Sequence, residues 1–152
     1  YTMTFLGNNT SAGSTTAFGG QGNGNTTVMG VQIFCDRSAS KNFIEFRNWS
    51  NSSIKTVLLD SQMDNDDMRW ITVTVESDLL SAYLNGSLVG TIDVTGMRDW
   101  LSWQGSGMDF GSMRGTLNRL LGNLAFYRLS QGALPPTQVA DLYGLDADYY
   151  NL

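Results

Sequence analysis

The sequence predicts an all-β protein, a two-sheet antiparallel jelly-roll sandwich that carries one short C-terminal α-helix. Glycine (17), serine (15), threonine (14) and asparagine (12) are abundant among the 152 residues, which favours strands and turns over packed helices. Hydrophobic residues still make up 41% of the chain and aromatic residues 11%, enough for one core. Short apolar segments also recur at regular spacing between turn residues, as they do in sandwiches.

The first strand is expected at residues 1–6, where polar and apolar residues alternate. Residues 7–27, almost all Gly, Ser, Thr, Asn and Gln, are expected to form a long loop. Further strands are predicted at residues 28–35, 43–49, 54–59, 70–76, 79–84 and 88–92. The Asn85-Gly86 pair predicts a type I′ hairpin turn between the last two strands, because both residues accept positive φ angles.

The last third of the chain is expected to hold fewer elements. Residues 94–118 are irregular, with room for one short strand, and residues 120–129 predict another strand. Residues 135–144 predict a helix, with Pro at its start, apolar residues on one face and Gly144 at its end. We expect this helix to be the only one, and residues 1–152 to be a single domain from a longer chain.

Several of these segments together resemble the laminin-G-like branch of the concanavalin A-like lectin and glucanase superfamily. They are, in order, a Trp-led strand (WITVTV, 70–75), an Asn-Gly hairpin (YLNGSLVG, 83–90), an aromatic strand (LAFYR, 124–128), ALPP (133–136) and VADLY (139–143). Each motif is weak alone, and their order is more specific. The resemblance implies a jelly-roll sandwich of two antiparallel sheets.

The chain departs from that family in two places. Gly122-Asn123 stands where the family has an Asp-Glu-like pair, which weakens any metal role carried over from those carboxylates. Residues 1–6 match an inner strand of the family's sandwich, so we expect the domain to lack the family's opening strand. We expect the open edge to be filled by upstream sequence or by another subunit through β-augmentation. The alternatives are that the Gly-rich segment folds back over the edge, or that the strand is absent and the core smaller.

Charge and composition exclude several classes of function. Nine basic residues against fourteen acidic ones give a net charge of −5, which opposes nucleic-acid binding. No apolar run is long enough to cross a membrane, so no membrane insertion is expected. The single cysteine, Cys35, lies in an apolar run and is expected to be buried.

The residues available for catalysis are few, so we expect no enzyme activity. The chain has no histidine, which removes the commonest general base and transition-metal ligand. Glycoside hydrolysis needs two carboxylates that flank the scissile bond. The only glutamates, Glu45 and Glu76, do not form the Glu-x-Asp-x-x-Glu strand of the superfamily's retaining glucanases.

Two groups of residues could hold a ligand. The candidates for a glycan site are aromatic and polar residues of the irregular stretch, Trp100, Trp103, Gln104, Asp109 and Phe110; alternatively, the two tryptophans pack on the sandwich. The candidates for Ca²⁺, the one cofactor considered, are Asp60, Asp64, Asp66 and Asp67, with Asp109 a further candidate from the rim site of calcium-binding family members. The alternative for the aspartate group is a solvated acidic loop, because no Ca²⁺-loop spacing is met.

Six asparagines lie in N-glycosylation sequons, namely Asn8, Asn9, Asn25, Asn48, Asn51 and Asn85. In a eukaryote this would indicate a glycosylated exterior protein, and in a bacterium or phage a surface rich in Ser, Thr and Asn. The resulting hypothesis is a non-catalytic structural or adhesion module of an extracellular, cell-surface or virion assembly, with other subunits or domains as partners. The alternative is a lectin-like carbohydrate-binding domain, calcium-dependent or not.

Overall fold

A computed structural model of the chain describes residues 1–9, 15–21, 30–36, 41–48, 53–60, 67–95, 108–110 and 122–152. The elements formed by these residues, in chain order, are β1 (Thr2–Asn9), β2 (Thr15–Gln21), β3 (Gly30–Asp36), β4 (Lys41–Asn48), β5 (Ser53–Asp60), β6 (Arg69–Glu76), β7 (Leu79–Leu84), β8 (Ser87–Asp93), β9 (Met108–Phe110), β10 (Gly122–Ser130) and α1 (Pro136–Tyr150). Within the described part of the chain, no helix is long and apolar enough to cross a membrane.

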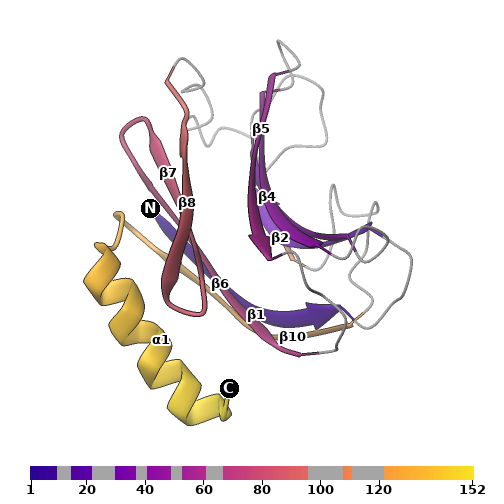
Figure 1. The fold of residues 1–152 in the computed structure, drawn as a ribbon, viewed down its shortest axis with the longest axis vertical. Helices are drawn as coiled ribbons and strands as arrows, with labels where there is room; N and C mark the ends of the chain where they lie inside the picture. The colour runs from indigo at the N-terminus through magenta and orange to yellow at the C-terminus, as the bar shows by residue number, and fades with distance from the viewer. Residues whose placement is uncertain are drawn as a thin grey trace.

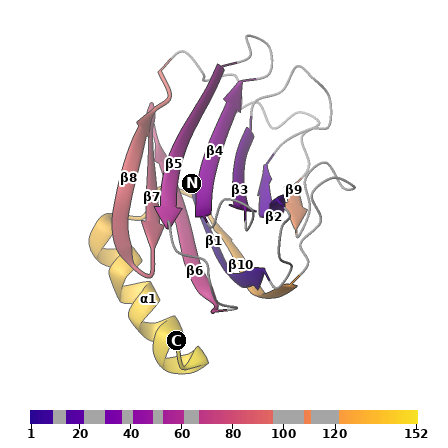
Figure 2. The same ribbon diagram turned by 45° about the vertical axis from the view of Figure 1, so that its right-hand side comes forward.

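The strands form two five-stranded sheets that face each other (Figures 1 and 2). The first has the strand order β10-β1-β6-β7-β8 and the second the order β5-β4-β3-β2-β9, and neighbouring strands are antiparallel throughout. Helix α1 lies against the side of the first sheet that points away from the second (Figure 1). The fold class predicted from the sequence, a two-sheet antiparallel sandwich with a C-terminal helix, is confirmed.

The core face of the first sheet points toward the second sheet and is apolar. It carries Met3, Phe5, Ile71, Val73 and Val75, which alternate with polar residues along β1 and β6. These side chains pack with two buried residues of β5 from the second sheet, and burying each contributes about 1.5–3 kcal/mol. The alternation that predicted both strands therefore builds the core.

The helix face of the same sheet carries Thr4, Leu6, Trp70, Thr72 and Tyr83, all of them buried. Its apolar part, Leu6, Trp70 and Tyr83, packs against Val139 of α1. The buried residues of α1 are Val139 and Asp146, both of which contact the sheet. Packing against the sheet, in addition to helix propensity, therefore stabilises the helix.

The sequence located most strands to within two residues. The hairpin turn is also confirmed, because Asn85 has φ 48° and Gly86 has φ 76°, as a type I′ turn requires. The short strand expected within residues 94–118 is β9.

The long loop expected at residues 7–27 is wrong in part. Residues 7–9 continue β1, and residues 15–21 form β2, which pairs with β3 and β9. Strand formation depends on partners more than on composition, so a Gly- and Thr-rich segment becomes a strand where two neighbours offer hydrogen bonds.

The expected helix end at Gly144 is also wrong, since α1 continues to Tyr150. A glycine costs a helix about 1 kcal/mol relative to alanine, which contacts of the following turn can offset. Here Asp146 bonds to the sheet below it. The helix ends instead at Asn151, which adopts the left-handed conformation with φ 57°.

The expectation that a donated strand completes the sheet beside residues 1–6 is wrong. Thr2 pairs with Ser130 of β10 on one side and with Thr74 of β6 on the other, and Thr4 is likewise paired on both sides. Strand β1 is an inner strand, as the family resemblance implied, but its outer neighbour comes from the C-terminal part of the same chain.

Candidate functional site

A pocket of about 360 Å³ lies where three segments meet: the start of β6, the turn between β7 and β8, and the end of α1. Its lining includes Asp67, Arg69, Asn85, Tyr143, Tyr150 and Asn151. The volume falls within the range of small-molecule sites, about 300–1,000 Å³. The lining combines aromatic rings with amide, carboxylate and guanidinium groups, so it can both stack and hydrogen-bond.

The hairpin turn forms one wall of this pocket. The backbone N–H of Asn85 donates to the carbonyl of Trp70 at 2.8 Å, and the N–H of Trp70 donates to Asn85 Oδ1 at 3.2 Å. Gly86 lies against the helix so closely that a Cβ there would be 2.9 Å from Cβ of Tyr143. The Asn-Gly pair therefore fixes the distance between the turn and α1 as well as the hairpin itself.

Tyrosines of α1 form the aromatic part of the site. Tyr143 meets the ring of Trp70 edge to face, with centroids 5.6 Å apart. Tyr150 packs beside Phe126, with centroids 5.5 Å apart, and its neighbour Tyr149 meets it edge to face at 4.8 Å. Tyr150 is still 39% exposed and Tyr149 is 80% exposed. Ring surface of this kind is suited to stacking on the C–H face of a sugar.

Among the described lining residues, the two charged side chains are paired with each other. Nη1 of Arg69 lies 3.6 Å from Oδ2 of Asp67. The arginine side chain is only 14% exposed, whereas the aspartate side chain is 59% exposed. A ligand entering from solvent therefore meets the carboxylate before the guanidinium.

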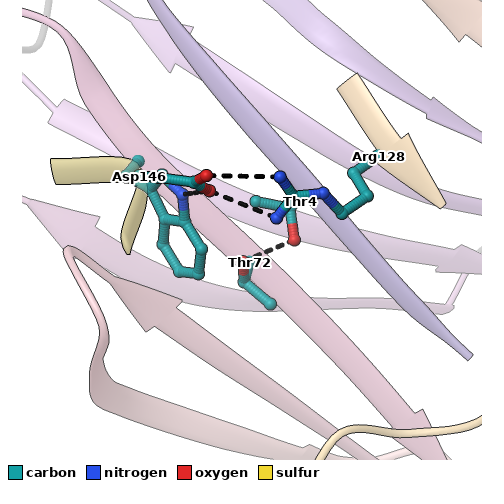
Figure 3. Close-up of polar contacts among 5 residues, drawn as sticks. Thr4, Thr72, Arg128 and Asp146 are labelled. Carbon is teal, nitrogen blue, oxygen red and sulfur yellow. Dashed lines mark hydrogen bonds and ion pairs between the residues drawn. The ribbon is translucent and has the colours of Figure 1, made fainter. Parts of the chain in front are cut away.

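A buried aspartate anchors the part of α1 that carries Tyr150. Oδ2 of Asp146 accepts a hydrogen bond from Trp70 Nε1 at 2.8 Å and one from Arg128 Nη1 at 3.2 Å, while Oδ1 accepts from Arg128 Nη2 at 3.2 Å. Figure 3 shows this two-pronged ion pair above the neighbouring hydrogen bond from Thr72 Oγ1 to Thr4 Oγ1, which measures 2.9 Å. Since Asp146 and Tyr150 are one helical turn apart, the ion pair positions the tyrosine at the pocket.

The glycan-site residues expected from the sequence lie either in β9 or outside the described residues. Asp109 and Phe110 belong to β9, where they pair with Gly20 and Gly19 of β2. Trp100, Trp103 and Gln104 lie outside the described residues. Their role in binding stays a prediction.

Of the four aspartates within residues 60–67 proposed as Ca²⁺ ligands, only Asp60 and Asp67 are among the described residues. Asp60 ends β5, Asp67 pairs with Arg69, and Asp64 and Asp66 lie outside the described residues. Over the described ranges, no group of three or more His, Cys, Asp or Glu side chains could hold a metal ion. The calcium site stays a prediction.

The sequons fall in different surroundings. Asn8 is buried, and its Oδ1 accepts from the backbone N–H of Asn123 at 2.9 Å and from Nδ2 of Asn123 at 3.2 Å. Asn85 is exposed at the hairpin tip. Asn9 and Asn48 lie in β1 and β4, and Asn25 and Asn51 lie outside the described residues. Glycosylation at these sites stays a prediction.

Sequence reasoning placed Tyr143 in the helix but missed the pocket residues at the end of α1. Tyr150 and Asn151 were beyond the expected helix end, and Arg69 was not singled out. One signal was available: Tyr149 and Tyr150 are adjacent aromatic residues on a surface helix, where one of the two must face solvent.

No protein-family model and no curated protein sequence matches the chain. Solved structures do match in fold. The CBM40 domain of the Ruminococcus gnavus IT-sialidase, bound to α2,3 sialyllactose, is 16% identical with a TM-score of 0.74, and the match covers 94% of this chain and 82% of that domain.

Two further similar structures come from other organisms. Domain 4 of AbnA, a GH43 extracellular arabinanase from Geobacillus stearothermophilus in complex with arabinotriose, is 14% identical with a TM-score of 0.72, over 93% of this chain and 65% of that one. The native heptameric SAP-like pentraxin of Limulus polyphemus is 14% identical with a TM-score of 0.67, over 93% and 68%.

These similarities define the class of fold: the chain has the β-sandwich fold that lectin-like and carbohydrate-binding domains use. At such low identity the likeness concerns the fold alone. The narrower resemblance to the laminin-G-like branch stays a prediction, because no family model matches.

Proposed function

We propose that this chain is a non-catalytic module that binds glycans through the pocket between β6, the β7–β8 turn and α1. The observation that carries the proposal is the pairing of an exposed tyrosine ring, Tyr150, with the amides of Asn85 and Asn151 and the carboxylate of Asp67 around one cavity. Sugar recognition needs these two elements together, a ring for the C–H face and polar groups for the hydroxyls.

The similar structures support the proposal. The R. gnavus domain is bound to sialyllactose and the arabinanase domain to arabinotriose, so two sandwiches of this fold hold oligosaccharides. Both belong to carbohydrate-active enzymes, which fits a module that brings a larger assembly to a glycan surface. The favoured hypothesis is therefore the lectin-like one, which the sequence alone placed second.

The absence of catalysis is part of the proposal. Among the described residues that line the pocket, Asp67 is the only acidic side chain, whereas glycoside hydrolysis uses two carboxylates on opposite sides of the bond.

A structural or adhesion role through protein contacts is the second candidate. The observation that favours it is the apolar surface at the end of α1, where Leu145, Tyr149 and Leu152 are exposed. Sedimentation analysis of the wild type and of Leu145→Ser tests it. Self-association that the substitution abolishes would support a role in an extracellular, cell-surface or virion assembly, and a monomer at all concentrations would not.

Glycan-array screening followed by calorimetry tests the main proposal. We expect binding to at least one oligosaccharide class, and we expect Tyr150→Ala to weaken it about ten-fold through loss of ring stacking. The control is Leu145→Ala, since Leu145 is exposed on the same helix and is not among the described residues that line the pocket. A silent array, or a Tyr150→Ala variant that binds as well as the wild type while folded, contradicts the proposal.

A further inference from the structure

The positive charge of Arg69, a residue of the pocket lining, is balanced by the carboxylate of Asp67. Arg69 is the basic residue among the described lining residues, and its side chain is 14% exposed beside the carboxylate of Asp67. The same Nη1 also approaches the carbonyl of Met68 at 3.5 Å. A guanidinium recognises a sugar carboxylate through two parallel N–H donors directed at it. Because Asp67 lies beside it and little of its side chain is exposed, Arg69 cannot direct two parallel N–H donors at a sugar carboxylate.

The carboxylate of Asp67 remains open to solvent. Its side chain is 59% exposed, so a sugar in the pocket is exposed to its negative charge. A carboxylate accepts hydrogen bonds from sugar hydroxyls readily, but a second carboxylate or a sulfate placed nearby raises the free energy of the complex through like-charge repulsion.

The described surroundings of the pocket contain no replacement cation. Among the residues whose side chains the structure describes, Arg128 is the other basic side chain, and it is held in the two-pronged ion pair with Asp146. The whole chain carries a net charge of −5, which adds a repulsive background for anionic ligands at low ionic strength.

We infer that this pocket selects neutral glycans and discriminates against acidic ones, with Asp67 as the residue that sets the preference. This inference rests on the proposed function, because it assigns a ligand class to the same pocket. Uncharged chains resemble the arabinotriose held by the arabinanase domain, whereas sialyllactose, held by the R. gnavus domain, carries the carboxylate that this pocket repels. The two domains share this chain's fold but hold ligands of different charge, so the fold alone does not determine the ligand class.

The experiment uses an array of neutral glycans printed beside their sialylated or uronate-bearing counterparts, with lactose and 3′-sialyllactose among the pairs. The tightest-binding pair is then measured by calorimetry against the wild type, Asp67→Asn and Asp141→Asn. Asp141 is exposed on α1 and does not line the pocket, so its substitution makes the same change in net charge at a different place.

We expect the wild type to bind the neutral member of each pair more tightly. Asp67→Asn should raise the affinity for the acidic member about five-fold relative to the neutral one, since one exposed like charge is removed and Arg69 is released. Asp141→Asn should leave that ratio within about two-fold, and NaCl at about 0.5 M should reduce the wild-type preference through screening.

Three results overturn the inference in distinguishable ways. If the wild type binds the acidic members more tightly, the ligand class is wrong while glycan binding stands. If Asp67→Asn and Asp141→Asn shift the ratio equally, net charge rather than the pocket sets the preference. If no glycan binds, the proposed function fails and the inference fails with it.

Discussion

The two faces of the first sheet are stabilised in different ways, although they belong to the same strands. The core face is apolar where β1 and β6 cross it, with Met3, Phe5 and Ile71 packed toward the second sheet. The helix face buries polar groups as well. Thr4 and Thr72 bond to each other there, and Asp146 of α1 bonds to Trp70 and Arg128.

The contacts on the two faces differ in how precisely they fix the position of the layer packed against them. Hydrophobic packing is roughly proportional to buried area and tolerates small shifts of one layer on another. Hydrogen bonds and ion pairs require particular distances and directions, and an unpaired buried partner is costly. The core face therefore supplies most of the stability, while the helix face places α1 in one position and with it the pocket.

The largest effect is expected on the core face. Phe5→Ala removes a fully buried ring that packs on Tyr127, with centroids 4.8 Å apart, and should lower the free energy of unfolding by about 3–5 kcal/mol. Denaturant titration followed by circular dichroism measures the loss. Leu88→Ala, at an exposed position of β8, is the control and should change stability by less than about 0.5 kcal/mol. Equal losses in the two variants would contradict this account of the core.

A smaller loss is expected from the anchor of the helix. Asp146→Ala leaves Trp70 Nε1 and Arg128 without their acceptor, and we expect about 2 kcal/mol of destabilisation, since Arg128 is partly exposed and can be resolvated. Amide hydrogen exchange should speed up at residues 145–150 more than in β1. The control is Asp148→Ala, an exposed aspartate of the same helix. Unchanged exchange at residues 145–150 would show that the ion pair does not hold this turn.

The threonine pair on the helix face is expected to contribute about 1 kcal/mol. Thr72→Val alone leaves Thr4 without its donor, so it should destabilise by roughly that amount. The double variant Thr4→Val with Thr72→Val replaces both partners by apolar groups of similar shape and should recover most of the loss. A double-mutant cycle in denaturant measures the coupling. Strict additivity of the two single changes would mean that the hydroxyls do not interact.

The last effect is absent at neutral pH and is expected only at alkaline pH. Burial raises the pKa of Tyr127 to about 12, above its ordinary value of 10.0. Between these values the unfolded chain loses the phenol proton and the folded chain keeps it. The contribution of Tyr127 to the free energy of unfolding is therefore constant below pH 10 and falls as the pH rises toward 12. Burial also raises the pKa of Tyr1, which adds to the fall. Tyr127→Phe should give a shallower fall in pH-dependent denaturation. Identical slopes for variant and wild type would contradict the assignment.

The core face could be predicted from the sequence because its signals are local. Alternation located β1 and β6, and the Asn85-Gly86 pair located the β7–β8 turn, since both depend on residues adjacent in the chain. The pairing of β1 with β10 could not be predicted. It joins Asn8 to Asn123, 115 positions apart, and nothing in either segment specifies the other.

The candidate site could not be predicted from the sequence for a related reason. Its walls come from residues 67–69, the turn at 85 and the end of α1 around 150, which tertiary packing alone brings together. The helix end was misplaced at Gly144 because glycine is a local stop signal, whereas the contact that carries the helix onward is Asp146 with Arg128, on a different strand. Asp67 was singled out as a metal ligand, which stays a prediction; its contact with Arg69 could not be foreseen from the sequence.

The position of β1 between β6 and β10 has a consequence for how the protein is made. During synthesis β1 emerges before both of its partners, can pair with β6 after about sixty further residues, and lacks its other neighbour until β10 has been translated. Thr2 is finally fixed by Gly132, 130 positions further on, when its Oγ1 donates to that carbonyl at 3.0 Å. Contacts of such long range fold slowly, because a long loop must close before they form. Strand β1, which precedes both of its partners in the chain, is thus among the last to be completed, and ribosome-bound intermediates expose one of its edges.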